Sequence, residues 1–344
     1  MTRPRIYLTR NIPDPGIEIL RNTGDLTIDE MNEETGPDRQ RVLAGVREAD
    51  VLVSLLTEPI DGEVMDANPN LLGIAQYAVG FNNIDVDAAT ERGLPVSNTP
   101  GVLSDTTADF AWTLLMASAR MIPQGHNYTV ANRYKIWGPN LLLGADISPG
   151  GSGEPKTLGI AGYGRIGRAV RKRASGFDMK IIAFDPYAPD SVFEEDGVER
   201  AETLDPLLEA SDFISIHVLL NEETRHLFST EEFSKMKSSA IIINTSRGPV
   251  IDEAALVTAL KEGQIGGAGL DVYENEPAMA EGLTELDNVV LAPHIASATR
   301  DTRGKMASMA AENAVAHLEK RPAPNCVNPE VYETEAYQKR VKGS

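Results

Sequence analysis

The chain has 344 residues, 51 of them acidic and 32 basic, and a formal net charge of −19. This length allows two domains of ordinary size, and the acidic excess argues against nucleic acid or an anionic membrane surface as the main partner. The only cysteine, Cys326, excludes an internal disulfide and favours a cytoplasmic location, and no apolar run approaches the length of a membrane span.

The first hundred residues alternate short apolar runs with helical patterns. Strands are expected at residues 5–9, 50–55, 72–78 and 94–98, and helices at residues 13–22 and 37–49. Because alternating strands and helices form parallel sheets covered on both faces, this part predicts a small open α/β domain. A long helix over residues 104–120 and a surface loop rich in Gly, Pro and Ser over residues 144–155 follow it.

The stretch 156–185 has the order strand, glycine turn, helix, strand and acid. Apolar runs at 158–161 and 180–184 flank a helical pattern that begins at residue 165. The glycines have G-x-G-x-x-G spacing and an acid ends the second run; these residues are Gly162, Gly164, Gly167 and Asp185. A glycine turn without a ligand is the structural alternative, but the strands, the helix and the acid together favour a dinucleotide-binding unit.

Each part of this unit has a physical role. Gly162 allows a tight turn, Gly164 lets the backbone approach a pyrophosphate, and Gly167 lets the helix pack close to the strand. The helix N-terminus offers free N–H groups to the phosphates. A carboxylate at Asp185 can accept the hydroxyls of the adenine ribose and would repel a 2′-phosphate, and no cation directly follows it. The sequence therefore predicts NADH rather than NADPH.

Charged residues follow three of the later strands, which are expected at 213–217, 240–244, 267–270 and 289–291. Arg247 follows the second of these strands, acids at 271–276 follow the third, and His294 follows the fourth. Since ligands bind at the carboxyl edge of open α/β sheets, these strand ends predict one crevice. Singly, each residue could be a surface charge, a helix cap or a structural histidine, but the combination favours a catalytic site. The remaining histidines have no metal-ligand spacing, so no metal site is expected; they are His126, His217, His226 and His317.

The motifs GYGRIG, NTSRGPVID, GLDVYENEP and APHIASAT resemble the D-isomer-specific 2-hydroxyacid dehydrogenase family. The resemblance runs from about Ile6 to Pro329, and VSLLTEPID, QYAVGFNNID and WGPNLLLGADI are closest to its glyoxylate and hydroxypyruvate reductases. The insert at 148–154 is longer than expected there.

The resemblance implies an α/β fold of two doubly wound parallel-sheet domains. A Rossmann NAD-binding domain is expected over residues 102–295, and a smaller flavodoxin-like substrate domain over residues 1–101 and 296–330, with a long helix at 300–318. The tail from Arg321 is expected to be loosely ordered, and residues 331–344 are expected to lie outside both domains.

The resemblance also implies roles for single residues. Arg247 would bind the substrate carboxylate and polarise its ketone, His294 would donate a proton, and Glu276 would favour the charged imidazole. The expected substrate-binding residues are Leu55, Val79, Gly80, Arg247 and Ser297. The expected cofactor-binding residues are Thr107, Gly162, Gly164, Arg165, Ile166, Gly167, Asp185, Thr245, Asp271 and His294. Asp271 would bond the nicotinamide carboxamide or nearby backbone.

The implied function is NADH-dependent reduction of small 2-keto acids such as glyoxylate and hydroxypyruvate. The loop at 54–58 supports small substrates, since it has no Lys or Arg, its Glu58 is acidic, and Leu55 and Leu56 would form an apolar wall. A homodimer with residues 104–137 at the contact is expected. Two alternatives remain open: an NAD(H)-sensing regulator that resembles the family's corepressors, and a dehydrogenase for another D-2-hydroxy acid such as 3-phosphoglycerate.

Overall fold

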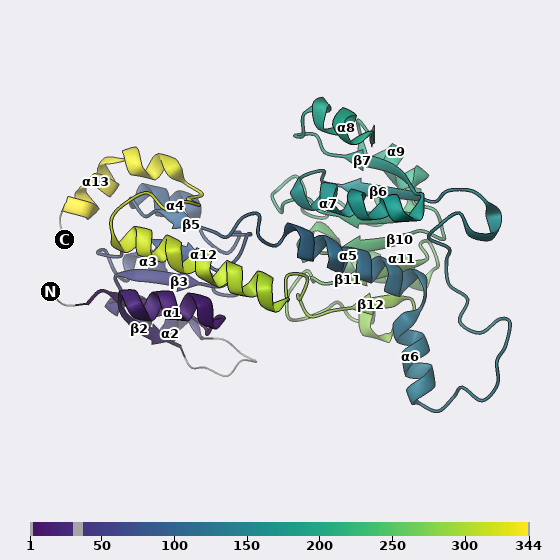
Figure 1. The fold of residues 1–344 in the computed structure, drawn as a ribbon, viewed down its shortest axis with the longest axis horizontal. Helices are drawn as coiled ribbons and strands as arrows, with labels where there is room; N and C mark the ends of the chain where they lie inside the picture. The colour runs from purple at the N-terminus through teal and green to yellow at the C-terminus, as the bar shows by residue number, and fades with distance from the viewer. Residues whose placement is uncertain (1–2, 30–36, 343–344) are drawn as a thin grey trace. The chain divides into compact units, whose positions relative to one another are not determined.

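The computed structural model describes residues 3–29 and 37–342. The chain divides into two compact units: unit 1 is Met1–Leu103 with Ala298–Ser344, and unit 2 is Ser104–Ser297. Each unit is a parallel sheet with helices on both faces (Figure 1), so the predicted fold class is confirmed. No helix among the described residues is long and apolar enough to cross a membrane.

Unit 1 contains a five-stranded sheet in the order β2-β1-β3-β4-β5, with every pair parallel. The order of strands is that of flavodoxin-like sheets, in which ligands bind where the order reverses, between β1 and β3. The strands are β1 Arg5–Leu8, β2 Asp25–Ile28, β3 Val51–Ser54, β4 Ile74–Gln76 and β5 Val96–Ser97.

Alternating side chains of β1 enter the two cores of unit 1. Ile6 and Leu8 pack toward helices α1 and α12, whereas Tyr7 packs toward α2. Helices α1 and α12 lie side by side (Figure 1), and a Cβ at Gly16 would approach the Ala307 carbonyl oxygen to 2.6 Å. The helices of this unit are α1 Asp14–Thr23, α2 Arg39–Glu48, α3 Gly62–Asp66, α4 Val86–Glu91 and α12 Arg300–Leu318.

The expectation of a loosely ordered tail is wrong for residues 325–342. Residues 325–328 run along β5, where the Val327 N–H donates to the Val96 carbonyl at 2.8 Å. The 3-10 helix η5 (Pro329–Glu333) and helix α13 (Glu335–Lys342) then bury Val331 and Tyr337. Arg340 donates to the carbonyls of Pro69, Leu71 and Arg92. The charged composition hid these anchors, because the few apolar side chains of the segment form no pattern in the sequence.

Unit 2 contains a seven-stranded parallel sheet in the order β12-β11-β10-β9-β6-β7-β8. The chain first builds outward from β6 to β8 and then returns to β9 on the other side of β6, which is the reversal that dinucleotide-binding sheets use. The strands are β6 Thr157–Ala161, β7 Lys180–Phe184, β8 Glu199–Arg200, β9 Phe213–Ile216, β10 Ile241–Asn244, β11 Gly267–Leu270 and β12 Val289–Leu291.

Two hydrophobic cores cover the faces of this sheet. One is formed with α5 and α7, and the other with α9, α10 and α11. The helices are α5 Ser104–Ala119, α6 Ile122–Val130, α7 Arg165–Ala174, α8 Asp190–Asp196, α9 Leu204–Ala210, α10 Thr230–Lys235 and α11 Glu253–Lys261. The insert at 148–154 forms an exposed turn that includes the 3-10 helix η1, Gly150–Ser152.

Candidate active site

The glycine turn lies between β6 and α7 and leaves space beside its middle glycine. Gly162 has φ = +91°, and a Cβ there would lie 2.6 Å from the His217 backbone, while a Cβ at Gly167 would overlap the Gly162 carbonyl. A Cβ at Gly164 would meet nothing within 4 Å. Gly162 and Gly167 are therefore required by packing, whereas the open side at Gly164 gives a ligand close access to the backbone.

The carboxylate of Asp185 is positioned by three backbone N–H groups at the end of β7. Its Oδ2 accepts from Tyr163 in the glycine turn at 2.8 Å, and its Oδ1 accepts from Tyr187 and Ala188 at 3.0 and 3.1 Å. The hydroxyl of Tyr187 donates to the Glu223 carboxylate. Asp185 and Glu223 thus both bond the loop after β7, and Asp185 also bonds the glycine turn.

Other residues expected at the cofactor lie at the same edge of the unit 2 sheet. Arg165 and Ile166 begin α7, where the first N–H groups of a helix lack intrahelical partners. Thr245 directly follows β10; its Oγ1 is buried and has no hydrogen-bond partner among the described residues. An open glycine turn and an unpaired buried hydroxyl suit a polar ligand, so these residues fit a dinucleotide.

Arg247 follows β10 and is brought into a loop by the Asn244 side chain. Asn244 Nδ2 donates to the Arg247 carbonyl at 3.0 Å, and its Oδ1 accepts from the Ser246 N–H at 2.9 Å. Burial lowers the pKa of the Arg247 guanidinium, and the negative charge of Glu276 opposes that shift. No sequence pattern indicates this role of Asn244, which is the last residue of a buried strand.

Glu276 and His294 form the contact expected for an acid and its imidazole partner. Oε2 of Glu276 lies 2.9 Å from Nδ1 of His294, and Oε1 accepts the Tyr273 N–H at 2.9 Å. Burial alone would raise the pKa of the Glu276 carboxyl, but the bonds to His294 and Tyr273 and the charge of Arg247 outweigh it, so its pKa lies below the ordinary value. The carboxylate is therefore ionised at neutral pH.

Asp271 holds the turn that carries His294. Its two carboxylate oxygens accept the N–H groups of Ile295 and Ala296, both at 2.8 Å, and its own carbonyl accepts the His294 N–H. His294 has φ = +54°, a conformation that this set of bonds stabilises. Burial raises the pKa of Asp271, opposed by the two N–H bonds. Of its two expected roles, bonding the nearby backbone is the one that the structure displays.

Gly248 brings the arginine loop directly against the loop that carries Glu276. A Cβ at Gly248 would overlap the backbone of Tyr273, so no larger residue fits without separating the two loops. The loop that carries Glu276 is also bonded by Glu253, whose buried carboxylate accepts hydrogen bonds from the N–H groups of Glu274 and Ala280 at 2.6 and 2.8 Å. Sequence reasoning missed Glu253, because a helical acid reads as an ordinary surface feature.

The loop after β3 in unit 1 differs from expectation at Glu58. Leu55 and Leu56 are half-buried, but Glu58 is buried and does not present its charge to solvent. Its carboxylate accepts from Thr9 Oγ1 at 2.9 Å, from the Leu55 N–H at 3.0 Å and from Thr57 Oγ1. Glu58 therefore anchors its own loop and ties it to the end of β1, a role that a short acidic loop does not reveal.

The remaining expected site residues have simple positions. Val79 and Gly80 are half-buried in the loop after β4 of unit 1, Thr107 is buried in the first turn of α5, and Ser297 is half-buried after the His294 turn. Their contacts with substrate or cofactor stay predictions.

The other histidines have partners or positions that do not belong to this constellation. His217 follows β9, contacts Ser215 Oγ at 2.8 Å, and burial lowers its pKa to about 3. His317 contacts Ser97 Oγ at 3.0 Å in unit 1, and burial lowers its pKa to about 4. His226 faces Glu274 at 2.7 Å, and His126 is exposed. No group of three or more metal-ligating side chains exists among residues 3–29 and 37–342.

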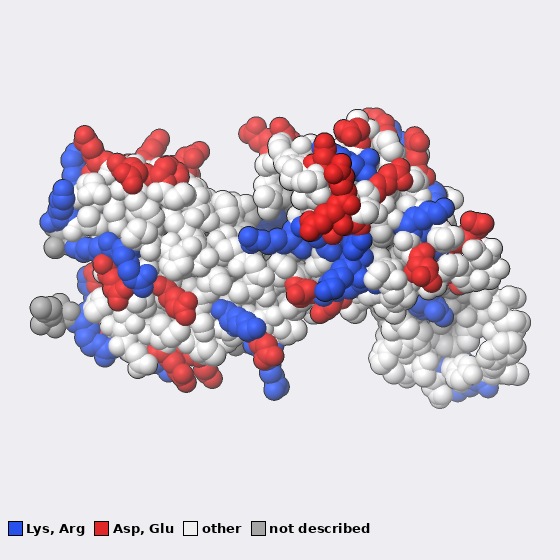
Figure 2. Space-filling model, turned by 45° about the horizontal axis from the view of Figure 1, so that its top comes forward, with Lys and Arg blue, Asp and Glu red and all other residues white. Residues whose placement is uncertain are grey.

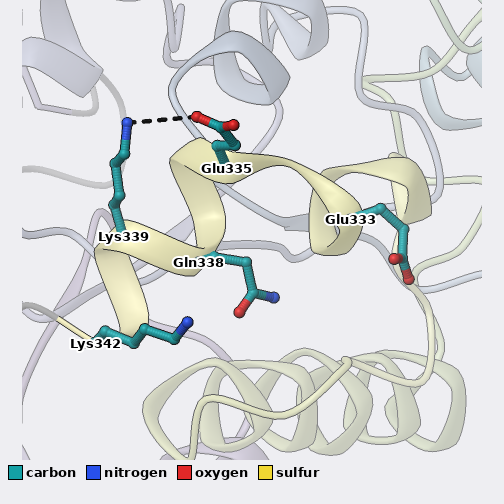
Figure 3. A pocket seen from close by; sticks show the side chains of 5 residues that line it. All are labelled: Glu333, Glu335, Gln338, Lys339 and Lys342. Carbon is teal, nitrogen blue, oxygen red and sulfur yellow. Dashed lines mark ion pairs between the residues drawn. The ribbon is translucent and has the colours of Figure 1, made fainter.

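A surface hollow in unit 1 has no expected site residue. Figure 3 shows that its lining comes from η5 and α13; the residues are Glu333, Glu335, Gln338, Lys339 and Lys342. Lys339 and Glu335 form an ion pair of 3.6 Å but remain largely exposed. Such a pair is screened by water and contributes little, so we assign this hollow no role.

The open glycine turn and three charged residues after neighbouring strands β10, β11 and β12 define a dehydrogenase that uses a nicotinamide dinucleotide. Residues 112–296 match the family described as "D-isomer specific 2-hydroxyacid dehydrogenase, NAD binding domain". The chain belongs to this family, as its motifs predicted, and is an oxidoreductase.

The chain is also similar to named members over nearly its whole length. It is 48% identical to a glyoxylate reductase of Korarchaeum cryptofilum, over 96% of this chain and 97% of that one. A glyoxylate reductase from Paecilomyes thermophila superposes with a TM-score of 0.82 at 33% identity, covering 95% and 99% of the chains. An NADPH-dependent glyoxylate/hydroxypyruvate reductase from Sinorhizobium meliloti, solved with NADP and malonate, gives 0.81 at 30% identity, covering 95% and 98%.

Proposed function

We propose that the protein reduces glyoxylate and hydroxypyruvate to their 2-hydroxy acids with NADH. The observation that carries the proposal is the constellation of Arg247, Glu276 and His294 at three neighbouring strand ends, with the Glu276–His294 contact at 2.9 Å. Relatives named glyoxylate reductase, 41–48% identical to this chain, support the substrate class.

In this proposal the bound nicotinamide supplies a hydride to the keto carbon. The Arg247 guanidinium pairs with the substrate carboxylate and attracts the keto oxygen, where negative charge develops. His294 donates the proton to that oxygen from Nε2, since Nδ1 faces Glu276. Glu276 fixes the ring orientation and favours the charged imidazole, because its own carboxylate stays ionised.

The environment of Asp185 supports NADH over NADPH. A 2′-phosphate bound near Asp185 would meet a fixed carboxylate, and Tyr187 is bonded to a second acid, Glu223. The residues directly after β7 include no Lys or Arg that could balance the charge. The Sinorhizobium meliloti relative is named NADPH-dependent, so the preference varies among proteins similar to this one.

The side chains of the loop after β3 favour the proposal that the substrates are small and unphosphorylated. Leu55 and Leu56 are half-buried and apolar, and with Glu58 folded inward the loop offers no cation for a phosphate. Arg10 follows β1, the neighbour of β3 in the sheet, so a cation does exist at this edge. A phosphorylated acid therefore belongs in the substrate panel.

The surface of α6 and the following loop supports a homodimer. Helix α6 buries none of its residues, and large apolar side chains remain exposed on it and after it: Ile122, Val130, Tyr134, Ile136, Trp137 and Leu143. This region carries few charged side chains on the face shown in Figure 2, whereas Lys and Arg alternate with Asp and Glu over much of the rest. Exposed apolar patches of this kind mark protein interfaces. The cytoplasm is the proposed compartment, because the single Cys326 forms no internal disulfide.

The test is oxidation of NADH by the purified protein with glyoxylate, hydroxypyruvate, pyruvate and phosphohydroxypyruvate, repeated with NADPH. We expect the highest kcat/KM with glyoxylate or hydroxypyruvate and NADH. Tight NADH binding without oxidation by any 2-keto acid would support the regulator instead. A highest value with the phosphorylated acid would support a dehydrogenase of phosphorylated substrates.

A further inference from the structure

Two side-chain amides of unit 1 connect the loop after β3 to the loop after β4 by hydrogen bonds. Asn83 Nδ2 donates to the carbonyls of Leu55 and Glu58 at 2.9 and 2.8 Å. Its Oδ1 accepts from Gln76 Nε2 at 2.8 Å, and Gln76 is fully buried. Gln76 Oε1 in turn accepts from Ser54 Oγ at 2.6 Å, at the end of β3. The two loops are thus joined by a continuous chain of hydrogen bonds.

A second amide controls the direction of the peptides at Val79 and Gly80. Asn98 Nδ2 donates to the Val79 carbonyl at 2.7 Å, and the Thr99 N–H donates to the Ala78 carbonyl at 2.8 Å. Because C=O and N–H point in opposite directions in a trans peptide, these bonds direct the N–H groups of Val79 and Gly80 away from Asn98 and Thr99. Neither N–H donates a hydrogen bond within residues 3–29 and 37–342.

We propose that Gln76, Asn83 and Asn98 are positioning residues for substrate: they fix the spacing of the two loops and present two backbone N–H groups to the substrate carboxylate. The inference rests on the proposed function, which gives Val79 and Gly80 that substrate. Charge-assisted bonds from backbone N–H groups are strong only when the donors are held in place, so loss of a holding amide weakens substrate binding.

A purely structural role would have a different outcome. Each amide also satisfies a partly buried acceptor, and removing such a bond costs stability wherever it occurs. Asn68 provides the matched control, since it is a buried amide of the same unit that donates to the carbonyls of Val46 and Ala49 at 3.0 and 2.6 Å. It contacts neither of the two loops.

The experiment compares Asn83→Asp, Asn98→Asp and Asn68→Asp in the full chain. An aspartate has the shape of asparagine but, when ionised, no donor for these carbonyls. The measurements are kcat and KM for glyoxylate, inhibition by oxamate as a 2-keto acid analogue that is not reduced, the Kd of NADH, and urea unfolding. Asn98→Ala, which adds no charge, serves if Asn98→Asp does not fold, and Asn83→Ala serves likewise.

We expect the variants at Asn83 and Asn98 to raise the KM and the oxamate inhibition constant about tenfold, with the Kd of NADH unchanged. Asn68→Asp should lose stability without a change in either constant. Equal KM values in all variants would overturn the inference and leave the proposed function intact. A wild type that reduces no 2-keto acid would overturn both.

Discussion

Glu276 and His294 are joined by a contact of 2.9 Å between Oε2 and Nδ1, which leaves the other ring nitrogen, Nε2, for the substrate. The two residues come from different loops, after β11 and β12. A buried carboxylate holds each loop by hydrogen bonds to its backbone N–H groups. Asp271 holds the turn of His294, and Glu253 holds the segment around Glu276. The relationship is therefore built into the sheet edge.

The first prediction concerns the pH dependence of reduction in Glu276→Gln. The pKa of Glu276 lies below its ordinary value, so its negative charge is present throughout the neutral range, 2.9 Å from the ring of His294. A neutral amide in its place removes that charge from beside the proposed proton donor. The alkaline limit of kcat/KM for reduction should move about one pH unit or more toward acid. An unchanged profile would remove Glu276 from the mechanism.

The second prediction concerns cofactor choice in Asp185→Asn. Wild type should prefer NADH by about 2 kcal/mol, roughly 30-fold in kcat/KM, because the carboxylate repels a 2′-phosphate. The asparagine loses the charge and keeps an oxygen for the Tyr163 N–H, but its amide nitrogen faces the N–H groups of Tyr187 and Ala188. Asp185→Ala therefore serves as a second variant without the charge. The ratio of kcat/KM for the two cofactors should approach one. Equal efficiency of the wild type with both would contradict this explanation.

The third prediction concerns Gly248→Ala. The added methyl group overlaps the Tyr273 backbone, so the loop of Arg247 must move away from the loop of Glu276. A displacement of this kind at a catalytic constellation costs about 100-fold in rate. Steady-state kinetics and circular dichroism should show a folded protein with a much lower kcat/KM. A matched change at Gly176, where a Cβ meets nothing within 4 Å, should leave kcat/KM unchanged. Full activity of Gly248→Ala would show that the two loops need not be in contact.

The fourth prediction concerns the assembly. Light scattering should give a dimer mass for the wild type, and the double change Ile136→Glu with Trp137→Glu should give more monomer, since both side chains are highly exposed in the single chain. The same double change should not lower the midpoint of thermal unfolding of the monomer, because the two side chains pack on no core. A monomer mass for the wild type at working concentration would contradict the proposed dimer.

The sequence predicted the sheet edge better than it predicted what supports that edge. The stretches at β7, α7, β11, β12 and α12 have the expected bounds, because their apolar residues recur with the spacing of a strand or a helix. Strands β2 and β8 were missed: Asp25–Ile28 alternates exposed and half-buried positions, and Glu199–Arg200 has two charged residues. Edge strands of this kind lack a continuous apolar run.

The supporting residues could not be predicted for a different reason. Glu253 and Asn83 act through backbone N–H and carbonyl groups of loops that are distant in sequence, and Glu58 reaches Thr9 at the end of β1. Sequence patterns record periodicity and spacing, whereas these bonds depend on where a loop returns in space. The order of the tail was not predicted because Val331 and Tyr337 are too few to give a pattern, and the bonds of Arg340 to three carbonyls leave no signal in the sequence.

If His294 supplies the proton for reduction of a 2-keto acid, turnover should be largely lost in His294→Asn. Asparagine preserves a polar side chain but cannot donate as a general acid. We expect an unchanged Kd for NADH and a kcat for glyoxylate lower by roughly 10²–10⁴-fold, the usual contribution of such a group. A variant that binds NADH normally and keeps a kcat within a few-fold of wild type would show that His294 is not the proton donor.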